Sequence, residues 1–153
     1  GNFYRNHTKC IHTEYQFTDL ISASLIKYSI NTFLSTKVIF FNELYKIFNN
    51  SNPNESWKNF IEIMAVDPRI GPSHMQVPGH DGKLGFGGPC FPKDNNALLE
   101  YSKQLEAPFH LLDACVTINN AIRNKYNNLS QREKDQNINF NSKIEKTNDG
   151  DIL

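Results

Sequence analysis

The stretch TDLISASLIKYSINTFLSTKVIFFNELYKIF, residues 18–48, decides the fold. Its apolar residues recur at helical spacing, and neither proline nor glycine interrupts it. The pattern predicts one helix of about 45 Å, at about 1.5 Å per residue. Shorter helical patterns follow it, and no alternation of strands and helices is present. The sequence therefore predicts an all-α domain built around a long spine helix.

The predicted spine helix is apolar over most of its circumference. A helix of that kind is largely surrounded by protein rather than lying on a surface. A chain of 153 residues offers little cover for so long an element. A second copy supplies that cover most easily, so we expect a homodimer that forms through this helix.

A narrow polar stripe interrupts the apolar surface of the spine helix. Its members recur at spacings of three and four, which place them on one face: Ser24, Lys27, Asn31 and Ser35. One interpretation is that the stripe is the solvated side of the helix. The other is that Lys27 and Asn31 point into a cleft and serve a ligand, because polar groups on a buried helix need partners.

A second informative stretch is GFGGPCFPKD, residues 85–94. Glycines let a backbone approach a neighbour closely, and prolines fix the chain on both sides of Cys90. Asp94 is predicted to cap the following helix, with Cys90 just ahead of the helix N-terminus and Lys93 adding positive charge. This setting favours the thiolate and predicts a nucleophile. The alternative is that Cys90 fills a hydrophobic hole.

The remaining elements are predicted to be shorter helices. Asn52-Pro53-Asn54-Glu55 has the pattern of a helix start, and that helix should stop before Pro68. The helix after Asp94 should end near residues 105–107, ahead of Pro108. A last helix places Cys115 at a core position, where we expect a buried filler.

The long loop between Asp67 and Lys93 is rich in glycine and proline. Loops of this length in compact domains are usually functional. Arg69 opens the loop and has two interpretations. It is either an ordinary salt-bridging residue or an anion ligand that reaches a phosphate.

Composition excludes several classes of function. The formal net charge is zero, which gives no electrostatic reason to expect a nucleic-acid partner. No apolar run approaches the roughly 20 residues that span a bilayer, and no secretory signal is apparent, so we expect no membrane partner and a cytoplasmic location. The three cysteines are widely spaced, which predicts reduced thiols. The group His7, Cys10 and His12 lacks a fourth ligand, so we expect no metal.

The same patterns divide the chain into three parts. Residues 1–17 have no clear period and are predicted to be a connector or a truncated N-terminal segment. Residues 18–126 form the helical domain with the cysteine loop. Residues 127–153 are rich in polar side chains, which predicts a polar linker or a disordered tail.

Four motifs together resemble the nucleotide-sugar 6-dehydrogenases, such as the UDP-glucose and GDP-mannose dehydrogenases. The resemblance covers roughly Asp19 to Tyr126. The motifs occur in the family's order: Lys27-Tyr28-x-x-Asn31-x-Phe33-Leu34, Asn42-Glu43, Asp67-Pro68-Arg69-Ile70-Gly71 and the stretch 85–94. The cysteine loop is the most specific of the four.

The resemblance implies a fold and a domain context. Members have an N-terminal Rossmann domain for NAD, a helical central domain with a long helix, and a C-terminal domain that helps to hold the nucleotide sugar. This chain resembles the central part alone, with a fold similar to the C-terminal domain of 6-phosphogluconate dehydrogenase. No Gly-x-Gly-x-x-Gly turn after a strand is present, so we expect no Rossmann sheet in this chain.

The resemblance also implies roles for individual residues. Cys90 would capture the intermediate aldehyde of the sugar during two hydride transfers to NAD. Lys27 and Asn31 would stabilise oxyanionic intermediates, and Asp94 would position or activate water. The remaining roles concern binding: Gly85, Phe86, Gly87 and Gly88 would line the sugar, Arg69 would reach the substrate across the dimer interface, and Lys93 would contact the cofactor.

Three departures from the family pattern stand beside these matches. Ser24 occupies a position that is usually acidic, nothing matches the family's proton-transfer glutamate, and the loop from His74 to Lys83 is longer than in common members. The leading hypothesis is a central domain that turns over nothing alone. The alternative is a helical dimerisation or nucleotide-sugar-binding module without dehydrogenase activity.

Overall fold

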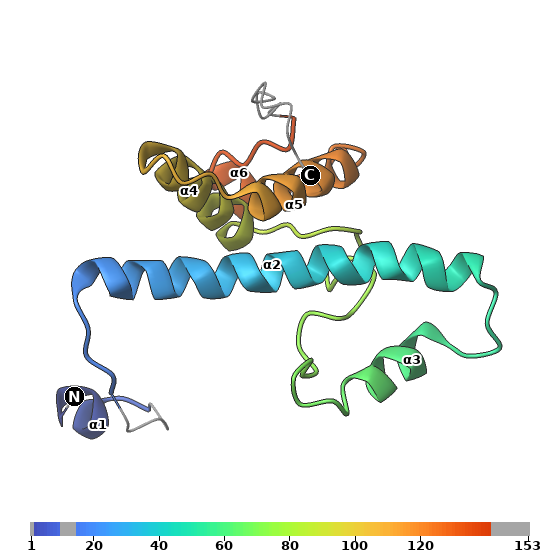
Figure 1. Cartoon of the computed structure of the whole chain (residues 1–153), viewed down its shortest axis with the longest axis horizontal. Helices are drawn as coiled ribbons and strands as arrows, with labels where there is room; N and C mark the ends of the chain where they lie inside the picture. Colours follow the sequence, from blue (N-terminus) through green and yellow to red (C-terminus); the bar gives the residue numbers. More distant parts are fainter. Residues whose placement is uncertain (1, 10–14, 142–153) are drawn as a thin grey trace.

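The computed structural model describes residues 2–9 and 15–141 and contains six helices there (Figure 1). Their bounds are α1 Asn2–His7, α2 Leu20–Asn50, α3 Trp57–Met64, α4 Cys90–Gln104, α5 His110–Arg123 and α6 Gln131–Asp135. These described residues include no β-strand. The all-α prediction is confirmed. Cys10, His12 and residues 142–153 of the predicted tail lie outside the described residues.

Helix α2 is the predicted spine and runs the length of the molecule (Figure 1). It has 31 residues, and Asp19 caps it by accepting hydrogen bonds from the backbone N–H groups of Ile21 and Ser22 at 2.9 and 3.0 Å. The side chain of an N-cap residue satisfies donors that the first helical turn leaves free. The sequence placed the same helix at 18–48, within two residues at each end.

The core forms where α4 and α5 pack together on one side of α2. One cluster joins Leu98 and Leu99 of α4 to Leu112 and Val116 of α5. A second cluster contains Ile39, Phe86, Ile122 and Cys115, which is only 3% exposed. The prediction of Cys115 as a buried filler is confirmed.

Helix α3 and the loop after it pack on the opposite side of α2, near its C-terminal half (Figure 1). Trp57 contacts Tyr45 edge-on at 5.0 Å between ring centroids, and it lies 5.4 Å from Phe48. Phe41, Met75 and Val77 are buried in the same cluster. Helices α4 and α5 therefore pack on one side of α2 and α3 packs on the other. The long loop runs between these two sides, from the end of α3 to the start of α4.

The predicted start of α3 is wrong. The helix begins at Trp57, and Ser56 is its N-cap, whose Oγ accepts a hydrogen bond from the backbone N–H of Asn59 at 3.1 Å. Asn52 has a φ of 49°, which is a left-handed conformation that an N-cap does not adopt. Asn52 thus belongs to the turn after α2. The end of α3 at Met64, ahead of Pro68, agrees with the prediction.

The predicted cap of α4 is also wrong. The helix begins at Cys90 with Pro89 as N-cap, so Asp94 lies inside the helix rather than at its start. Cys90 is the first helical residue rather than a residue just ahead of the helix. Asp94 is 1% exposed because its partners come from α2, as described below. The end of α4 at Gln104 agrees with the prediction.

The packed part of the chain extends beyond residue 126, into the segment for which the sequence predicts a linker or tail. Helix α6 has a capping box in which Ser130 and Glu133 exchange hydrogen bonds. Glu133 is 2% exposed and Phe140 is 7% exposed. Residues 127–141 therefore form part of the helical domain.

Candidate active site

Three predicted site residues meet where α2 crosses α4. The carboxylate oxygen Oδ2 of Asp94 accepts a hydrogen bond from Lys27 Nζ at 2.9 Å and another from Asn31 Nδ2 at 2.6 Å. One turn further along α2, Ser35 is fully buried and bonds to Asn95 at 2.9 Å. The polar stripe on α2 therefore faces α4, with Ser35 buried and Asn31 half-buried, whereas Ser24 and Lys27 are exposed. The interpretation as a solvated side is wrong for Asn31 and Ser35.

The charges in this cluster stabilise one another. Burial raises the pKa of Asp94, but the hydrogen bonds from Lys27 and Asn31 outweigh it and hold the pKa below its usual range. The hydrogen bond to Asp94 raises the pKa of Lys27, with smaller contributions from the charge of Asp94 and from Tyr28 and Cys90. At neutral pH the cluster therefore holds a carboxylate and an ammonium.

Asp94 keeps one oxygen atom for a further partner. Its Oδ1 is buried and makes no hydrogen bond to any described residue, while Lys93 Nζ lies 3.7 Å away. A buried carboxylate oxygen normally has a donor, from protein or from water. The side chains of Lys27 and Lys93 are 58% and 54% exposed, so both ammonium groups also reach the solvent.

Cys90 begins α4, one helical turn before Asp94. Residues four apart on a helix share a face, so Cys90 and Asp94 lie on the same side of α4. The thiol of Cys90 is exposed, whereas that of Cys115 is buried. The alternative in which Cys90 fills a hydrophobic hole is therefore wrong for this chain.

The glycines before Cys90 line a cleft of about 1060 Å³ on the side of the long loop. Gly85, Phe86, Gly87 and Gly88 form one wall, and Phe91 follows Cys90 on the same wall. Val38 of α2, one side of α3 with its C-cap Ala65, and loop residues 72–77 and 79–81 form the rest. The cleft has the size of a small-molecule site.

Buried asparagines hold this wall in place, and sequence reasoning gave them no role. Asn42 of α2 accepts a hydrogen bond from the backbone N–H of Gly85 at 2.9 Å. Asn119 of α5 accepts one from Phe86 N at 2.7 Å and donates one to Phe86 O at 3.1 Å. A Cβ atom on Gly85 would lie 2.6 Å from Asn119 Oδ1, so contact with α5 also requires this glycine. Asn42 belongs to the Asn42-Glu43 motif of the resemblance, which carried no role for it, and Asn119 had no sequence signal beyond a polar residue at a core position of an apolar helix.

The structure does not bring Arg69 into the cluster. Its guanidinium pairs with Asp67, with Nη2 to Oδ2 at 2.6 Å and Nε to Oδ1 at 3.0 Å, and its side chain is 88% exposed. Within this chain Arg69 has the contacts of a salt-bridging residue. Its exposure leaves it accessible to a neighbouring molecule.

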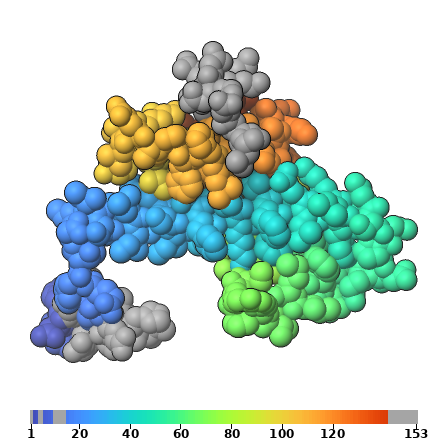
Figure 2. Space-filling view, viewed as in Figure 1, coloured from blue at the N-terminus to red at the C-terminus, as the bar shows by residue number. Residues whose placement is uncertain are grey.

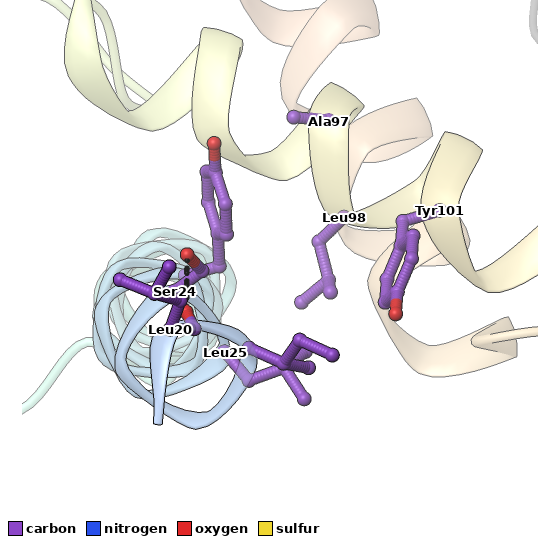
Figure 3. A pocket seen from close by; sticks show the side chains of 8 residues that line it. Leu20, Ser24, Leu25, Ala97, Leu98 and Tyr101 are labelled. Atoms are coloured by element: carbon purple, nitrogen blue, oxygen red, sulfur yellow. Dashed lines mark hydrogen bonds between the residues drawn. The ribbon is translucent and has the colours of Figure 1, made fainter. Parts of the chain in front are cut away.

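A separate apolar groove of about 320 Å³ lies between the first turns of α2 and the middle of α4 (Figure 3). Leu98 and Tyr101 project from α4 toward Leu20 and Leu25 of α2. The lining is apolar apart from Ser24 and two tyrosine hydroxyls. Neither Cys90 nor Lys27, Asn31 and Asp94 lines this groove, so it is separate from the cluster between α2 and α4.

Comparison with known proteins agrees with this geometry. The central-domain model of the UDP-glucose/GDP-mannose dehydrogenase family matches residues 21–121, which include the whole cluster and the cysteine loop. This chain belongs to that family. The matched range ends before α6, so Glu133 and its helix lie outside the part that the family model describes.

Several curated relatives are similar to this chain over its matched part, at 36–39% identity. UDP-glucose 6-dehydrogenase YwqF of Bacillus subtilis is 39% identical over 107 residues, which cover 67% of this chain and 22% of the relative. UDP-glucose 6-dehydrogenase TuaD of the same organism is 37% identical over 67% of this chain and 21% of the relative. UDP-glucose 6-dehydrogenase of Rickettsia bellii is 36% identical over 69% of this chain and 23% of the relative. The match spans about a fifth of each relative's length.

No helix among the described residues is long and apolar enough to cross a membrane.

Proposed function

We propose that this chain is the catalytic-cysteine domain of an NAD-dependent nucleotide-sugar 6-dehydrogenase that converts UDP-glucose to UDP-glucuronate. The observation that carries the proposal is the meeting of Lys27 and Asn31 with Asp94, one helical turn from the exposed thiol of Cys90. A thiol can capture an aldehyde, hydrogen-bond donors can stabilise the resulting oxyanion, and a carboxylate can orient the water that hydrolyses the thioester.

Cys90 is the nucleophile in this proposal. Its sulfur attacks the C6 aldehyde carbon of the sugar, and the carbonyl oxygen takes up the negative charge. Lys27 has three N–H donors and Asn31 has two, and Asp94 receives one from each. The remaining donors are available to an oxyanion. An ammonium and an amide held in advance stabilise such a charge without rearrangement.

Asp94 orients water rather than removing its proton. Its pKa lies below the usual range, which makes the carboxylate a weak base. Its Oδ2 fixes Lys27 and Asn31, and its buried Oδ1 accepts a hydrogen bond from a water molecule. Loss of a hydride from C6 of the thiohemiacetal would leave a thioester on Cys90. The water attacks the thioester carbon, the C–S bond breaks, the acid leaves, and the proton of the water passes to the Cys90 thiolate or to solvent.

NAD, when bound, supplies the two-electron acceptor for both oxidations. The described residues offer no glycine-rich turn between a strand and a helix, which is the usual cradle for its pyrophosphate. A Rossmann domain outside this chain would therefore hold most of the cofactor. From this chain, the half-exposed ammonium of Lys93 at the start of α4 is available to it.

The cleft beside residues 85–88 is the proposed sugar site. Its wall includes Gly88, two residues before Cys90, and Phe91, the residue after it, so a ligand in the cleft would lie beside the backbone that carries the thiol. Arg69 is available to a substrate held by a neighbouring copy because its side chain is 88% exposed. Its pairing with Asp67 would have to open for that contact.

A homodimer through α2 is part of the proposal. Figure 2 shows α2 as an uncovered band between the α4–α5 side and the α3 side of the molecule. Five large apolar residues on one side of this helix are more than half exposed: Ile26, Ile30, Phe33, Phe40 and Ile47. Their spacings of three, four and seven place them in one stripe. A second copy of the stripe would cover it.

A domain graft tests the proposed function. Residues 20–141, which include α6, replace the part of UDP-glucose 6-dehydrogenase YwqF that corresponds to this domain, and the graft is assayed for NAD reduction with UDP-glucose. We expect turnover that is lost when Cys90 is changed to serine, and none from the isolated chain. A folded dimeric graft that binds UDP-glucose and never reduces NAD would favour the binding-module alternative.

A further inference from the structure

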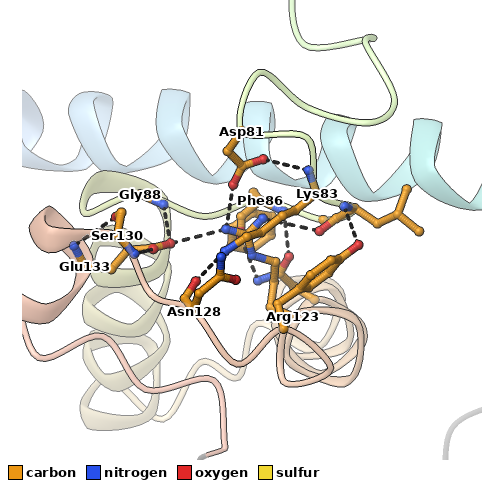
Figure 4. Close-up of polar contacts among 12 residues, drawn as sticks. Asp81, Lys83, Phe86, Gly88, Arg123, Asn128, Ser130 and Glu133 are labelled. Carbon is orange, nitrogen blue, oxygen red and sulfur yellow. Dashed lines mark hydrogen bonds and ion pairs between the residues drawn. The ribbon is translucent and has the colours of Figure 1, made fainter.

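Helix α6 contacts the cysteine loop through the buried carboxylate of Glu133 (Figure 4). Its Oε1 accepts a hydrogen bond from the backbone N–H of Gly88 at 2.8 Å, and its Oε2 accepts one from Ser130 N at 2.7 Å. Arg123 Nη2 lies 3.2 Å from Oε1. The carboxylate of Glu133 thus links α5, α6 and Gly88, which lies two residues before Cys90.

Arg123 holds the loop at a second point. Its Nη2 also pairs with Asp81 Oδ2 at 2.8 Å, and its Nη1 donates to Leu84 O at 3.4 Å. The side chain is 2% exposed, and the guanidinium lies between 5 and 6 Å from the rings of Tyr126 and Phe140. The guanidinium is therefore fixed by ion pairs and by aromatic contacts.

Gly87 provides an independent sign that this ion pair shapes the loop. A Cβ atom on Gly87 would lie 2.6 Å from Glu133 Oε1 and would collide with the guanidinium of Arg123. The loop backbone is pressed against the Arg123–Glu133 pair, and only glycine fits there. Contact with α5 and α6, and not only contact with a ligand, requires a glycine at this position.

We propose that Glu133 and Arg123 are positioning residues for Cys90, which act by fixing the Gly88 amide and the loop backbone against α5 and α6. This inference rests on the proposed role of Cys90 as nucleophile. It assigns a function to α6, which lies outside the range that matches the family model.

The chain between the anchor and the thiol is short and stiff. Gly88 has a φ of 74°, Pro89 is the N-cap of α4, and Cys90 is the first helical residue. Proline restricts the backbone between them. Movement at Gly88 therefore displaces the sulfur from Lys27, whereas a fixed Gly88 holds it in the cluster.

The test compares Glu133→Gln with Asp135→Asn in the full chain. Both remove one carboxylate from α6, but Asp135 is exposed and pairs only with Gln131 among the contacts that the structure describes. Hydrogen exchange of the Gly88 amide is measured by NMR. We expect exchange to rise by about tenfold or more in Glu133→Gln, because a bond to a charged acceptor is lost, and to stay unchanged in Asp135→Asn.

A second readout reports where the thiol lies. Iodoacetate is anionic and iodoacetamide is neutral, so the ratio of their rates at Cys90 measures the net charge near the thiol, to which Lys27, Lys93 and Glu133 contribute. Loss of the Glu133 charge alone would raise this ratio, so a fall reports displacement of the thiol from the lysines. We expect the ratio in the unchanged chain to exceed that of the unfolded chain, and to fall by about twofold in Glu133→Gln, the size of effect that an exposed charge pair produces. A loss of global stability alone would not change this ratio in folded molecules.

Three outcomes overturn the proposal. The first is that the Gly88 amide of the unchanged chain exchanges as fast as an unprotected amide. This measurement needs no variant, so it tests the proposal even if Glu133→Gln does not fold. The second is fast exchange in Glu133→Gln with an unchanged reagent ratio. The third is an equal response to Asp135→Asn. A failure of the proposed function has a different signature: the graft oxidises UDP-glucose without Cys90, while Gly88 remains protected.

Discussion

Lys27 and Asp94 are 67 residues apart in the chain, yet Lys27 Nζ and Asp94 Oδ2 lie 2.9 Å apart. Asn31 shares the same oxygen at 2.6 Å. This contact fixes α4 against the spine helix, and Cys90 begins α4. The ion pair therefore determines where the thiol lies as well as which donors surround it.

Removal of the Asp94 carboxylate should destabilise the domain. In Asp94→Asn the buried group loses its charge-assisted bonds to Lys27 and Asn31, and we expect a loss of about 1–3 kcal/mol in the free energy of unfolding. Denaturant titration measures it. The matched control is Glu100→Gln, which removes an exposed partner of Lys103 and should cost less than about 1 kcal/mol. Equal losses in the two variants would show that the buried contact stabilises the fold no more than an exposed ion pair does.

The two described cysteines should react at different rates. Burial raises the pKa of the Cys115 thiol, although hydrogen bonds from Thr36 and Ser35 oppose this, and only 3% of the residue is exposed. Cys90 is exposed. We expect iodoacetamide to label Cys90 well before Cys115 in the folded chain, and both at similar rates in denaturant, as followed by peptide mass spectrometry. Similar rates in the folded chain would mean that the fold does not distinguish the two thiols.

Acid should weaken the anchor at Glu133. Burial raises the pKa of this carboxyl, but hydrogen bonds from Ser130 and Gly88 and the charge of Arg123 lower it from 4.5 to about 2. A depressed folded-state pKa contributes stability that is fully present above the unfolded value and is lost as pH falls through the folded value. We expect this contribution to disappear between about pH 4.5 and pH 2.

The comparison with Glu133→Gln isolates that contribution, because other carboxylates also titrate in this range. The difference in unfolding free energy between the unchanged chain and the variant should be constant near neutral pH and shrink as pH falls below 4.5. Denaturant titrations at several pH values measure it. A difference that does not depend on pH would contradict the lowered pKa of Glu133.

A charge in the exposed stripe of α2 should prevent dimer formation. Phe33 is 69% exposed in the single chain, and Phe33→Glu would place a carboxylate in the proposed interface. We expect sedimentation to show a dimer for the unchanged chain and a monomer for this variant. Ile63→Glu is the matched control, because Ile63 is 62% exposed on α3, away from the stripe. A monomeric unchanged chain at micromolar concentration would remove the dimer from the proposal.

Sequence reasoning found the elements whose signals are local. The uninterrupted apolar pattern of α2 predicted its bounds within two residues, and Pro108 predicted the end of α4. The resemblance also identified Lys27 and Asn31, which the structure brings to one carboxylate. Periodicity alone left open whether their stripe faced solvent or protein, because the answer depends on α4.

The errors arose where distant contacts decide the structure. Aspartate is a common N-cap residue, but Asp94 lies inside α4, where its carboxylate bonds to Lys27 and Asn31 of α2. Asn52 and Ser56 both fit a helix start, and the left-handed backbone of Asn52 decides between them. Helix α6 has five residues and a polar composition, so its burial depends on the contacts of Glu133 with Arg123 and with Gly88, which is 45 residues away in the chain. Its capping box, Ser130-x-x-Glu133, was the one local signal.

The most direct measurement is the rate of acid formation by the YwqF graft with and without the thiol of Cys90. The graft oxidises UDP-glucose in the presence of NAD, and acid-quenched samples are digested and examined by mass spectrometry. We expect Cys90→Ser to lower acid formation by at least about a thousandfold, and any covalent sugar adduct to lie on the peptide that contains Cys90. Acid formation within tenfold of the unchanged graft, or an adduct on another residue, would contradict the role of Cys90 as the nucleophile.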